Sequence, residues 1–165
     1  MKNVIVKSSS VQGKGVYSLK NFRTGEVVLE IDDTHLVTDP KQLTNEEYES
    51  HCDYFENKVV LMQSPEVYIN HSCDPNTYVK TIGGIRKVLA MRDIKIGDEI
   101  TYDYSINGDN DGTFKCGCGS KNCRGVYQGN FSKLPRELQL KYLQYLDNWF
   151  VNKHIKEIER LKMIK

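Results

Sequence analysis

Three cysteines crowded into eight glycine-rich residues constrain this chain more than any other feature. Only Gly117 separates Cys116 from Cys118, and Cys123 follows after four more residues. A small residue between two cysteines lets the chain curl, so that both sulfurs can reach one ion, and a structural zinc is held by four ligands. The cluster supplies three ligands. The fourth must therefore come from another segment, which the metal would tie to this one.

The spacing alone leaves the identity of the fourth ligand open. The candidates are Cys52, Cys73 and the four histidines. The alternative, three reduced cysteines in a loop without a metal, fits such dense spacing poorly. Residues 1–7 are too short and too charged for a signal peptide, and no apolar window is long enough for a membrane helix. We therefore expect an intracellular, reducing compartment, where cysteines are metal ligands or buried thiols rather than disulfides.

The composition suits one soluble domain. The chain has 165 residues, of which 39% are hydrophobic and 27% charged, enough for a core of its own. Its formal net charge is +1, so no overall field attracts it to nucleic acid. We expect no direct nucleic-acid binding and no membrane association.

A second unusual stretch lies near the middle of the chain. Residues 68–76 read Tyr-Ile-Asn-His-Ser-Cys-Asp-Pro-Asn, which places amide, imidazole and thiol groups beside an Asp-Pro turn. Asn, Asp and Pro favour bends and local hydrogen bonds. A strand or helix built only for packing would not combine them, so this stretch is a candidate functional segment.

Short strands dominate the chain before residue 130. Alternating or β-branched apolar residues predict strands over 3–8, 26–31, 58–62, 77–82, 85–90 and 100–104, and residues 12–17 are predicted to be a glycine turn running into another short strand. Gly83-Gly84 is a two-residue hairpin signal between two of them. A helix is predicted from Pro40 to about His51, and a polar loop over 105–112.

The pattern becomes helical over residues 134–162. Leu138, Tyr142, Tyr145 and Trp149 fall on one helical face, and Asp147-Asn148 divides the segment into two helices. We expect Trp149 and Phe150 to be core anchors rather than substrate contacts. The sequence thus predicts a β-rich (α+β) fold with a C-terminal helical extension.

Taken together, these segments resemble a SET-domain protein lysine methyltransferase. The resemblance covers roughly residues 3–125 and includes four motifs in order. They are the GxG motif at 13–17, the NHSCxPN motif at 70–76, the GEELTYDY motif at 97–104 and the CxCx4C post-SET zinc module at Cys116, Cys118 and Cys123. The glycine motif is weak alone, and no helix pattern follows it, which argues against a dinucleotide-binding fingerprint.

The resemblance implies a fold and a ligand set. The fold is one of small β-sheets in which the central motif threads with the segment carrying Tyr102 and Tyr104 as a pseudoknot. We expect a SET domain over 3–112, a post-SET zinc module over 113–126 and a helical extension over 130–165. In proteins with this module, the cysteine of the NHSC motif joins the late cysteines on zinc, which makes Cys73 the fourth ligand here. Cys52 is left as an ordinary half-buried thiol.

The resemblance also implies S-adenosylmethionine as methyl donor. Gly13 to Gly15 would contact this cofactor through the backbone. The expected cofactor-binding residues are Lys14, Gly15, Val16, Tyr17, Asn70, His71 and Tyr104. Within this set, Asn70 and His71 would hold the amino-acid and adenine portions of the cofactor.

Three tyrosines are the expected catalytic residues. Methyl transfer to a lysine is an in-line displacement by the neutral amine, so alignment and a dry channel are the main tasks. Tyr104 matches the catalytic tyrosine, and its ordinary pKa near 10 suits orientation rather than proton abstraction. Tyr102 falls at a Phe/Tyr position that affects the number of methyl groups added, and its hydroxyl favours mono- or dimethylation. Tyr54 is a candidate for the lysine channel, with a core tyrosine as the alternative.

Two departures from the family pattern concern the pore and the cofactor side. Ile31-Asp32-Asp33 stands where Tyr-x-Gly is common, and Val67-Tyr68-Ile69 stands where Arg-Phe-Ile is common. A cysteine-rich pre-SET region is also absent, so other packing must stabilise the early strands, and the C-terminal helices are the candidate partner.

The expected activity is protein-lysine N-methylation. The partner is a protein with an exposed lysine, with histone tails as the best-represented substrates of the family. The competing hypothesis is a catalytically weak SET module acting as a binding or scaffold domain. We expect a nuclear location if the source is eukaryotic or the protein acts on host chromatin, and a cytoplasmic one otherwise.

Overall fold

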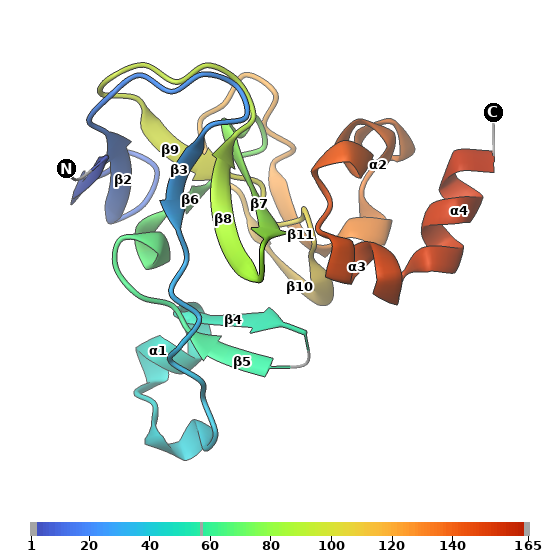
Figure 1. Ribbon diagram of the computed structural model, residues 1–165, viewed down its shortest axis with the longest axis horizontal. Coiled ribbons are helices and arrows are strands. Elements are labelled where there is room, and N and C mark those ends of the chain that lie inside the picture. Colours follow the sequence, from blue (N-terminus) through green and yellow to red (C-terminus); the bar gives the residue numbers. More distant parts are fainter. Residues whose placement is uncertain (1–2, 57, 164–165) are drawn as a thin grey trace.

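The computed structural model describes residues 3–56 and 58–163 and is built around one mixed sheet (Figure 1). Within the described residues its strands are β1 (Val4–Ser8), β2 (Lys14–Ser18), β3 (Val27–Glu30), β6 (Asn70–His71), β7 (Thr77–Ile82), β8 (Ile85–Ala90) and β9 (Glu99–Tyr102). They lie in the order β1-β2-β9-β7-β8-β3, and β6 pairs with β9. The β7–β8 hairpin turns at the predicted Gly83-Gly84, both with positive φ.

Parallel pairing to β9 is what threads the central motif through the fold. Asn70 pairs with Thr101, and both His71 and Thr77 pair with Tyr102. The side chain of Asn76 secures the crossing, because its Nδ2 donates to the carbonyl of Glu99 (2.8 Å) and its Oδ1 accepts from the Thr101 amide (2.9 Å). The predicted pairing of the two motif segments is confirmed.

Two separate hairpins flank the main sheet. One consists of β4 (Cys52–Phe55) and β5 (Lys58–Leu61), and the other of β10 (Asp109–Lys115) and β11 (Val126–Asn130). The strand predicted over 58–62 is confirmed as β5, whereas β4 and β11 are additional. The loop predicted over 105–112 is wrong in its second half. Every residue of β10 is exposed, so the strand carries no hydrophobic alternation, and its register shifts between Asp109 and Thr113.

The single helix predicted from Pro40 to His51 is also wrong. The structure has a short 3-10 turn, η1 (Pro40–Gln42), followed by α1 (Asn45–Ser50). Thr44 starts α1 with a capping box: its Oγ1 accepts from the Glu47 amide, and Glu47 accepts from the Thr44 amide. An N-cap inside the predicted span ends one element and begins the next.

The C-terminal extension is a chain of short helices. It comprises η3 (Phe131–Lys133), α2 (Arg136–Tyr142), η4 (Leu143–Tyr145), α3 (Asn148–Lys153) and α4 (Ile155–Met163). The predicted break at Asp147-Asn148 is confirmed, and a further break occurs at His154. Residues 164–165 of the expected extension lie outside the described residues. No helix in the described part of the chain is long and apolar enough to span a membrane.

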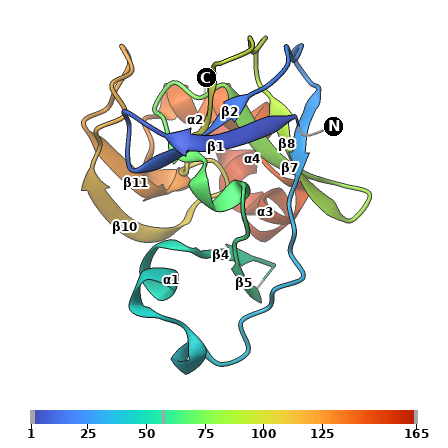
Figure 2. The same ribbon diagram turned by 90° about the vertical axis from the view of Figure 1, so that its left-hand side faces the viewer.

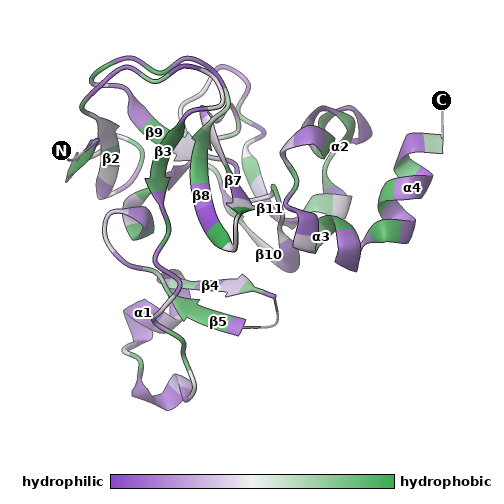
Figure 3. Ribbon diagram, viewed as in Figure 1, coloured by the Kyte–Doolittle hydropathy of each residue, from purple (hydrophilic) through white to green (hydrophobic). Residues whose placement is uncertain are grey.

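The two halves of the molecule have separate hydrophobic cores. The first core is formed by strands and includes Val16, Val28, Ile31 and Ile100. The second contains Tyr142 of the predicted helical face and Phe150 as an anchor, and the other three residues of that face pack against it partly buried. Hydrophobic bands recur along β8 and α4 in Figure 3. The early strands pack on β8 and β9, and the helices lie on the far side of β7 and β11 (Figures 1 and 2). The expectation that the early strands pack against those helices is therefore wrong.

Candidate cofactor and metal site

Four thiols meet where the central motif approaches the β10–β11 hairpin. The sulfurs of Cys73, Cys116, Cys118 and Cys123 all lie within 4.8 Å of one another, and those of Cys73 and Cys116 are 3.7 Å apart. Sulfur ligands about 2.3 Å from a tetrahedral zinc are ~3.8 Å apart, so the spacing fits a four-coordinate ion. The cluster unites the three late cysteines with Cys73. Cys52 is half-buried and is not in the cluster.

Backbone amides stabilise negative charge on this cluster. The Arg124 amide donates to Sγ of Cys73, and the Gly125 amide donates to Sγ of Cys123, each at 3.4 Å. Burial acts to raise the pKa of Cys118, but hydrogen bonds, including one with Ser120, lower it to about 6. Burial raises the pKa of Cys73 and Cys116, so binding of an ion would itself deprotonate these two thiols. Four sulfur donors suit an ion such as zinc.

His71 contacts both the metal cluster and the second motif. Its Nε2 lies 3.4 Å from Sγ of Cys73, and its Nδ1 accepts from the Tyr104 amide at 3.2 Å. Burial lowers the pKa of His71 to about 4, outweighing the opposing charge of Asp103. The imidazole is therefore neutral at physiological pH, consistent with an Nδ1 that accepts a hydrogen bond.

Tyr104 is fixed by the same segment. Its hydroxyl donates to the carbonyl of Ile69 at 2.7 Å, and its ring packs 4.7 Å from the ring of Tyr102. Burial, reinforced by Tyr127, raises the pKa of Tyr104 well above its ordinary value. The hydroxyl therefore stays protonated, which suits positioning and excludes a role as general base.

A cavity of about 80 Å³ opens beside these residues. It is lined by Val11, Gln12, Asn70, His71, Tyr104, Phe114, Lys115, Gly117 and Cys118. Three predicted cofactor-binding residues, Asn70, His71 and Tyr104, thus share one cavity. Phe114 and Lys115 were not predicted, because a strand of exposed residues gives no signal for a binding site.

The four residues predicted from the glycine motif do not line this cavity. The carbonyl of Lys14 accepts from Asn70 Nδ2 at 2.9 Å, which holds the loop against the central motif. Val16 is fully buried in the first core. The hydroxyl of Tyr17 donates to Glu99 at 3.1 Å. Among the described residues, the glycine motif reaches the cavity through its neighbours Val11 and Gln12.

Glu99 is the acidic residue that joins three motifs, and the sequence did not single it out. Its Oε1 accepts from Ser9 Oγ and from Asn70 Nδ2, each at 2.8 Å. A Cβ on Gly15 would lie 2.3 Å from the same oxygen. The glycine is therefore required by the close approach of a carboxylate. The sequence feature that could have identified Glu99 is its position inside the GDEITYDY motif.

The remaining positions singled out in the sequence do not line this cavity. Tyr54 on β4 is 63% exposed, so the alternative of a core tyrosine is wrong. Ile31 is buried in the first core, and Asp33, two residues on, accepts hydrogen bonds from Arg86. Trp149 packs against the second core and meets the ring of Phe55 on β4 edge to face, at 5.9 Å.

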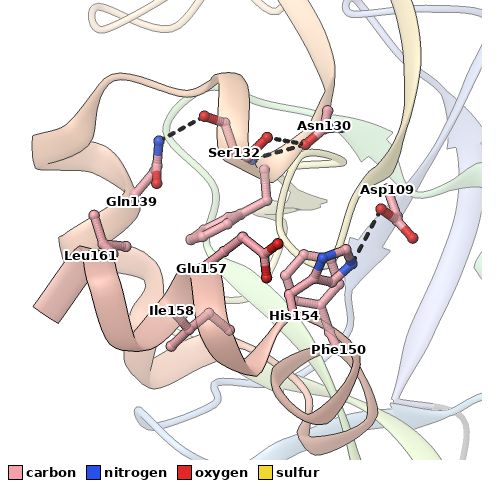
Figure 4. A pocket seen from close by; sticks show the side chains of 10 residues that line it. Asp109, Asn130, Ser132, Gln139, Phe150, His154, Glu157, Ile158 and Leu161 are labelled. Carbon is pink, nitrogen blue, oxygen red and sulfur yellow. Dashed lines mark hydrogen bonds and ion pairs between the residues drawn. The ribbon is translucent and has the colours of Figure 1, made fainter.

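A larger cavity, of about 130 Å³, lies in the C-terminal extension (Figure 4). Phe131 and Phe150 contribute its apolar lining, and His154 Nε2 lies 3.2 Å from Asp109 Oδ1 in its wall. None of the residues predicted to bind cofactor, substrate or metal is part of its lining.

Comparison with known proteins agrees with this geometry. The sequence profile of the SET domain matches residues 13–105, more than half of the chain. The chain is 33% identical over 129 residues to histone-lysine N-methyltransferase trithorax of Drosophila virilis, covering 70% of this chain. It is 28% identical over 140 residues to a Saccharomyces cerevisiae histone-lysine N-methyltransferase described as H3 lysine-4 specific, covering 75% of this chain. The chain spans only 3% and 13% of these two relatives.

A solved structure supports the fold. The crystal structure of a Plasmodium falciparum candidate histone methyltransferase superposes with a TM-score of 0.50 at 24% identity, covering 62% of this chain and 92% of that one. The threaded strands, the motif cavity and the cysteine cluster define a SET-type domain with a metal-binding module. The chain belongs to the SET domain family.

Proposed function

We propose that this protein is an S-adenosylmethionine-dependent protein-lysine N-methyltransferase. The observation that carries the proposal is the convergence of Asn70, His71 and Tyr104 on one cavity within a SET domain. S-adenosylmethionine would supply an activated methyl group there. Asn70 and the neutral His71 would hold the cofactor, and Tyr104 would align the reacting groups through its fixed hydroxyl.

We further propose zinc as the ion of the four-cysteine cluster. Four thiolates leave no open coordination position, so the ion would be structural. We also propose that the chain divides into a SET domain (3–112), a post-SET module (113–126) and a helical extension (130–165). Tyr102 and the exposed Tyr54 would lie on the side of the site that receives the substrate lysine.

The relatives named above favour a histone as substrate and the nucleus as the place of action. The test is incubation with labelled S-adenosylmethionine, core histones and a cell extract, followed by mass spectrometry of labelled proteins. We expect label on a lysine side chain. Label on another residue type would contradict the proposal.

One feature favours a second candidate, a SET module that binds without catalysing. Ile31 is packed in the core and offers no hydroxyl to a pore. Binding of S-adenosylmethionine in calorimetry, without methyl transfer to any core histone or extract protein, would support this alternative.

A further inference from the structure

One oxygen of the buried Glu66 carboxyl has no hydrogen-bond partner. The Glu66 side chain is only 7% exposed, and Oε2 contacts no donor. Its nearest cation, Arg86, lies 4.0 Å from the other oxygen and already donates to Asp33 and Asp53. A buried polar atom is normally satisfied, so an orphaned one calls for an explanation.

Glu66 belongs to the segment that fixes Tyr104. It begins η2 (Glu66–Tyr68), and its carbonyl accepts from the Ile69 amide at 2.8 Å. The carbonyl of Ile69 in turn accepts the Tyr104 hydroxyl. Burial, and then the charges of Tyr104, Asp53 and Glu66, raise the pKa of Tyr102. Glu66 thus acts electrostatically on Tyr102 and is joined through the backbone of Ile69 to the hydroxyl of Tyr104.

The surroundings of Glu66 carry an excess of negative charge. Asp32, Asp33 and Asp53 act on Glu66 electrostatically, against the single guanidinium of Arg86. Exposure decreases from Asp53 (36%) to Asp33 (25%) to Glu66 (7%). Acidic groups thus extend from the surface to the buried carboxyl, an arrangement that attracts a cationic side chain.

We propose that Glu66 binds the side-chain amine of the target lysine, which donates an N–H to the free oxygen Oε2. This inference rests on the proposed lysine methylation. Donation of one N–H would fix the position of the amine nitrogen while Tyr104 aligns the donor side. Glu66 would thereby distinguish lysine from apolar side chains of similar length.

The proposed contact depends on pH. Burial raises the pKa of Glu66 to about 8; Arg86 opposes this shift, and Asp53, Asp33 and Asp32 add to it. Tyr102, on which Glu66 acts electrostatically, has a pKa raised well above 10 by burial and stays protonated in this range. A free lysine remains an ammonium ion up to a pH of about 10.4. The carboxylate and the ammonium ion therefore coexist above pH 8, where binding of the amine should strengthen.

The test is a double-mutant cycle on binding in the presence of S-adenosylhomocysteine. The probes are the peptide labelled in the experiment above and the same peptide with norleucine in place of its target lysine. At pH 9 we expect norleucine to weaken binding to the wild type about tenfold or more, the effect of losing a charge-assisted hydrogen bond. Glu66→Gln should bind both peptides equally. Glu159→Gln, an exposed change on α4, should discriminate as the wild type does.

Equal discrimination by Glu66→Gln and the wild type would overturn the role of Glu66. A second measurement needs no variant: discrimination by the wild type should rise between pH 7 and pH 9, and a constant value would also overturn it. If the wild type labels a lysine but the cycle shows no coupling, only this inference fails. If the wild type labels no lysine, the proposed function fails and this inference with it.

Discussion

The carboxylate of Asp103 accepts two hydrogen bonds from the guanidinium of Arg124, at 2.6 and 2.9 Å. Asp103 is fully buried between Tyr102 and Tyr104, and Arg124 directly follows the metal-cluster residue Cys123. The hydroxyl of Tyr142 on α2 donates to the same carboxylate at 3.0 Å. One buried acid thus joins the GDEITYDY motif, the cysteine module and the helical extension.

Arg124→Gln should destabilise the fold. It removes the bidentate partner of a buried carboxylate, which costs about 3 kcal/mol. Urea unfolding measures the loss. Arg92→Gln is the matched control, because the pair of Arg92 with Asp74 is half exposed and should contribute less than about 1 kcal/mol. Equal losses in the two variants would contradict a special role for Asp103.

Removing the Cys118 thiol should abolish metal binding and weaken cofactor binding. Cys118 is part of the sulfur cluster and of the cofactor-side cavity, and Cys73 contacts His71. We expect Cys118→Ser and chelator-treated wild type to lose zinc and to bind S-adenosylmethionine more weakly in calorimetry. Cys52→Ser should retain the metal. Full cofactor affinity after metal loss would show that the two sites are independent.

Gly15→Ala should weaken cofactor binding through Glu99. The added Cβ would displace the carboxylate that holds Asn70 and Ser9, two hydrogen bonds worth about 1 kcal/mol each. The dissociation constant for S-adenosylmethionine should rise about tenfold or more. Gly84→Ala strains a distant turn with positive φ and should leave this constant unchanged. An equal effect in both variants would point to general destabilisation.

Glu66 should make the folded state less stable at alkaline pH. Its pKa, about 8, lies above the ordinary value of 4.5, so the folded protein holds this proton more tightly. The resulting stabilisation is complete below pH 4.5 and is lost as the pH rises through 8. The melting temperature of Glu66→Gln should therefore rise relative to wild type between pH 5 and pH 9. The melting temperature of Glu159→Gln should differ from that of the wild type by the same amount at every pH in this range.

The motifs predicted which segments lie in contact, but they predicted few of the side-chain contacts between those segments. The threading of the central motif with the segment of Tyr102 and Tyr104, and the members of the sulfur cluster, followed from a resemblance carried by a few residues. The roles of Glu99, Asp103 and Glu66 depend on which side chains face each other across the threaded strands. That information lies in contacts between residues distant in the sequence.

The secondary-structure errors have local causes. The exposed β10 offers no alternation to detect, and Thr44 is a helix start within a span that read as one helix. The helical character of the C-terminal extension and its break at Asp147-Asn148 were predicted correctly because Tyr142, Tyr145 and Trp149 repeat at helical spacing, but the further division into short helices was not. The packing partner of these helices was not predicted correctly, since periodicity identifies a buried face without identifying what covers it.

The rate of methyl transfer in a single turnover tests the central claim most directly. Tyr104→Phe removes the hydroxyl that Ile69 fixes beside the cofactor cavity. We expect the rate of transfer to lysine to fall about 100-fold, as for loss of one preorganised hydrogen-bonding group, while the dissociation constant for S-adenosylmethionine stays within about twofold of the wild-type value. An unchanged rate in the folded variant would contradict the assignment of Tyr104 and of the site built around it.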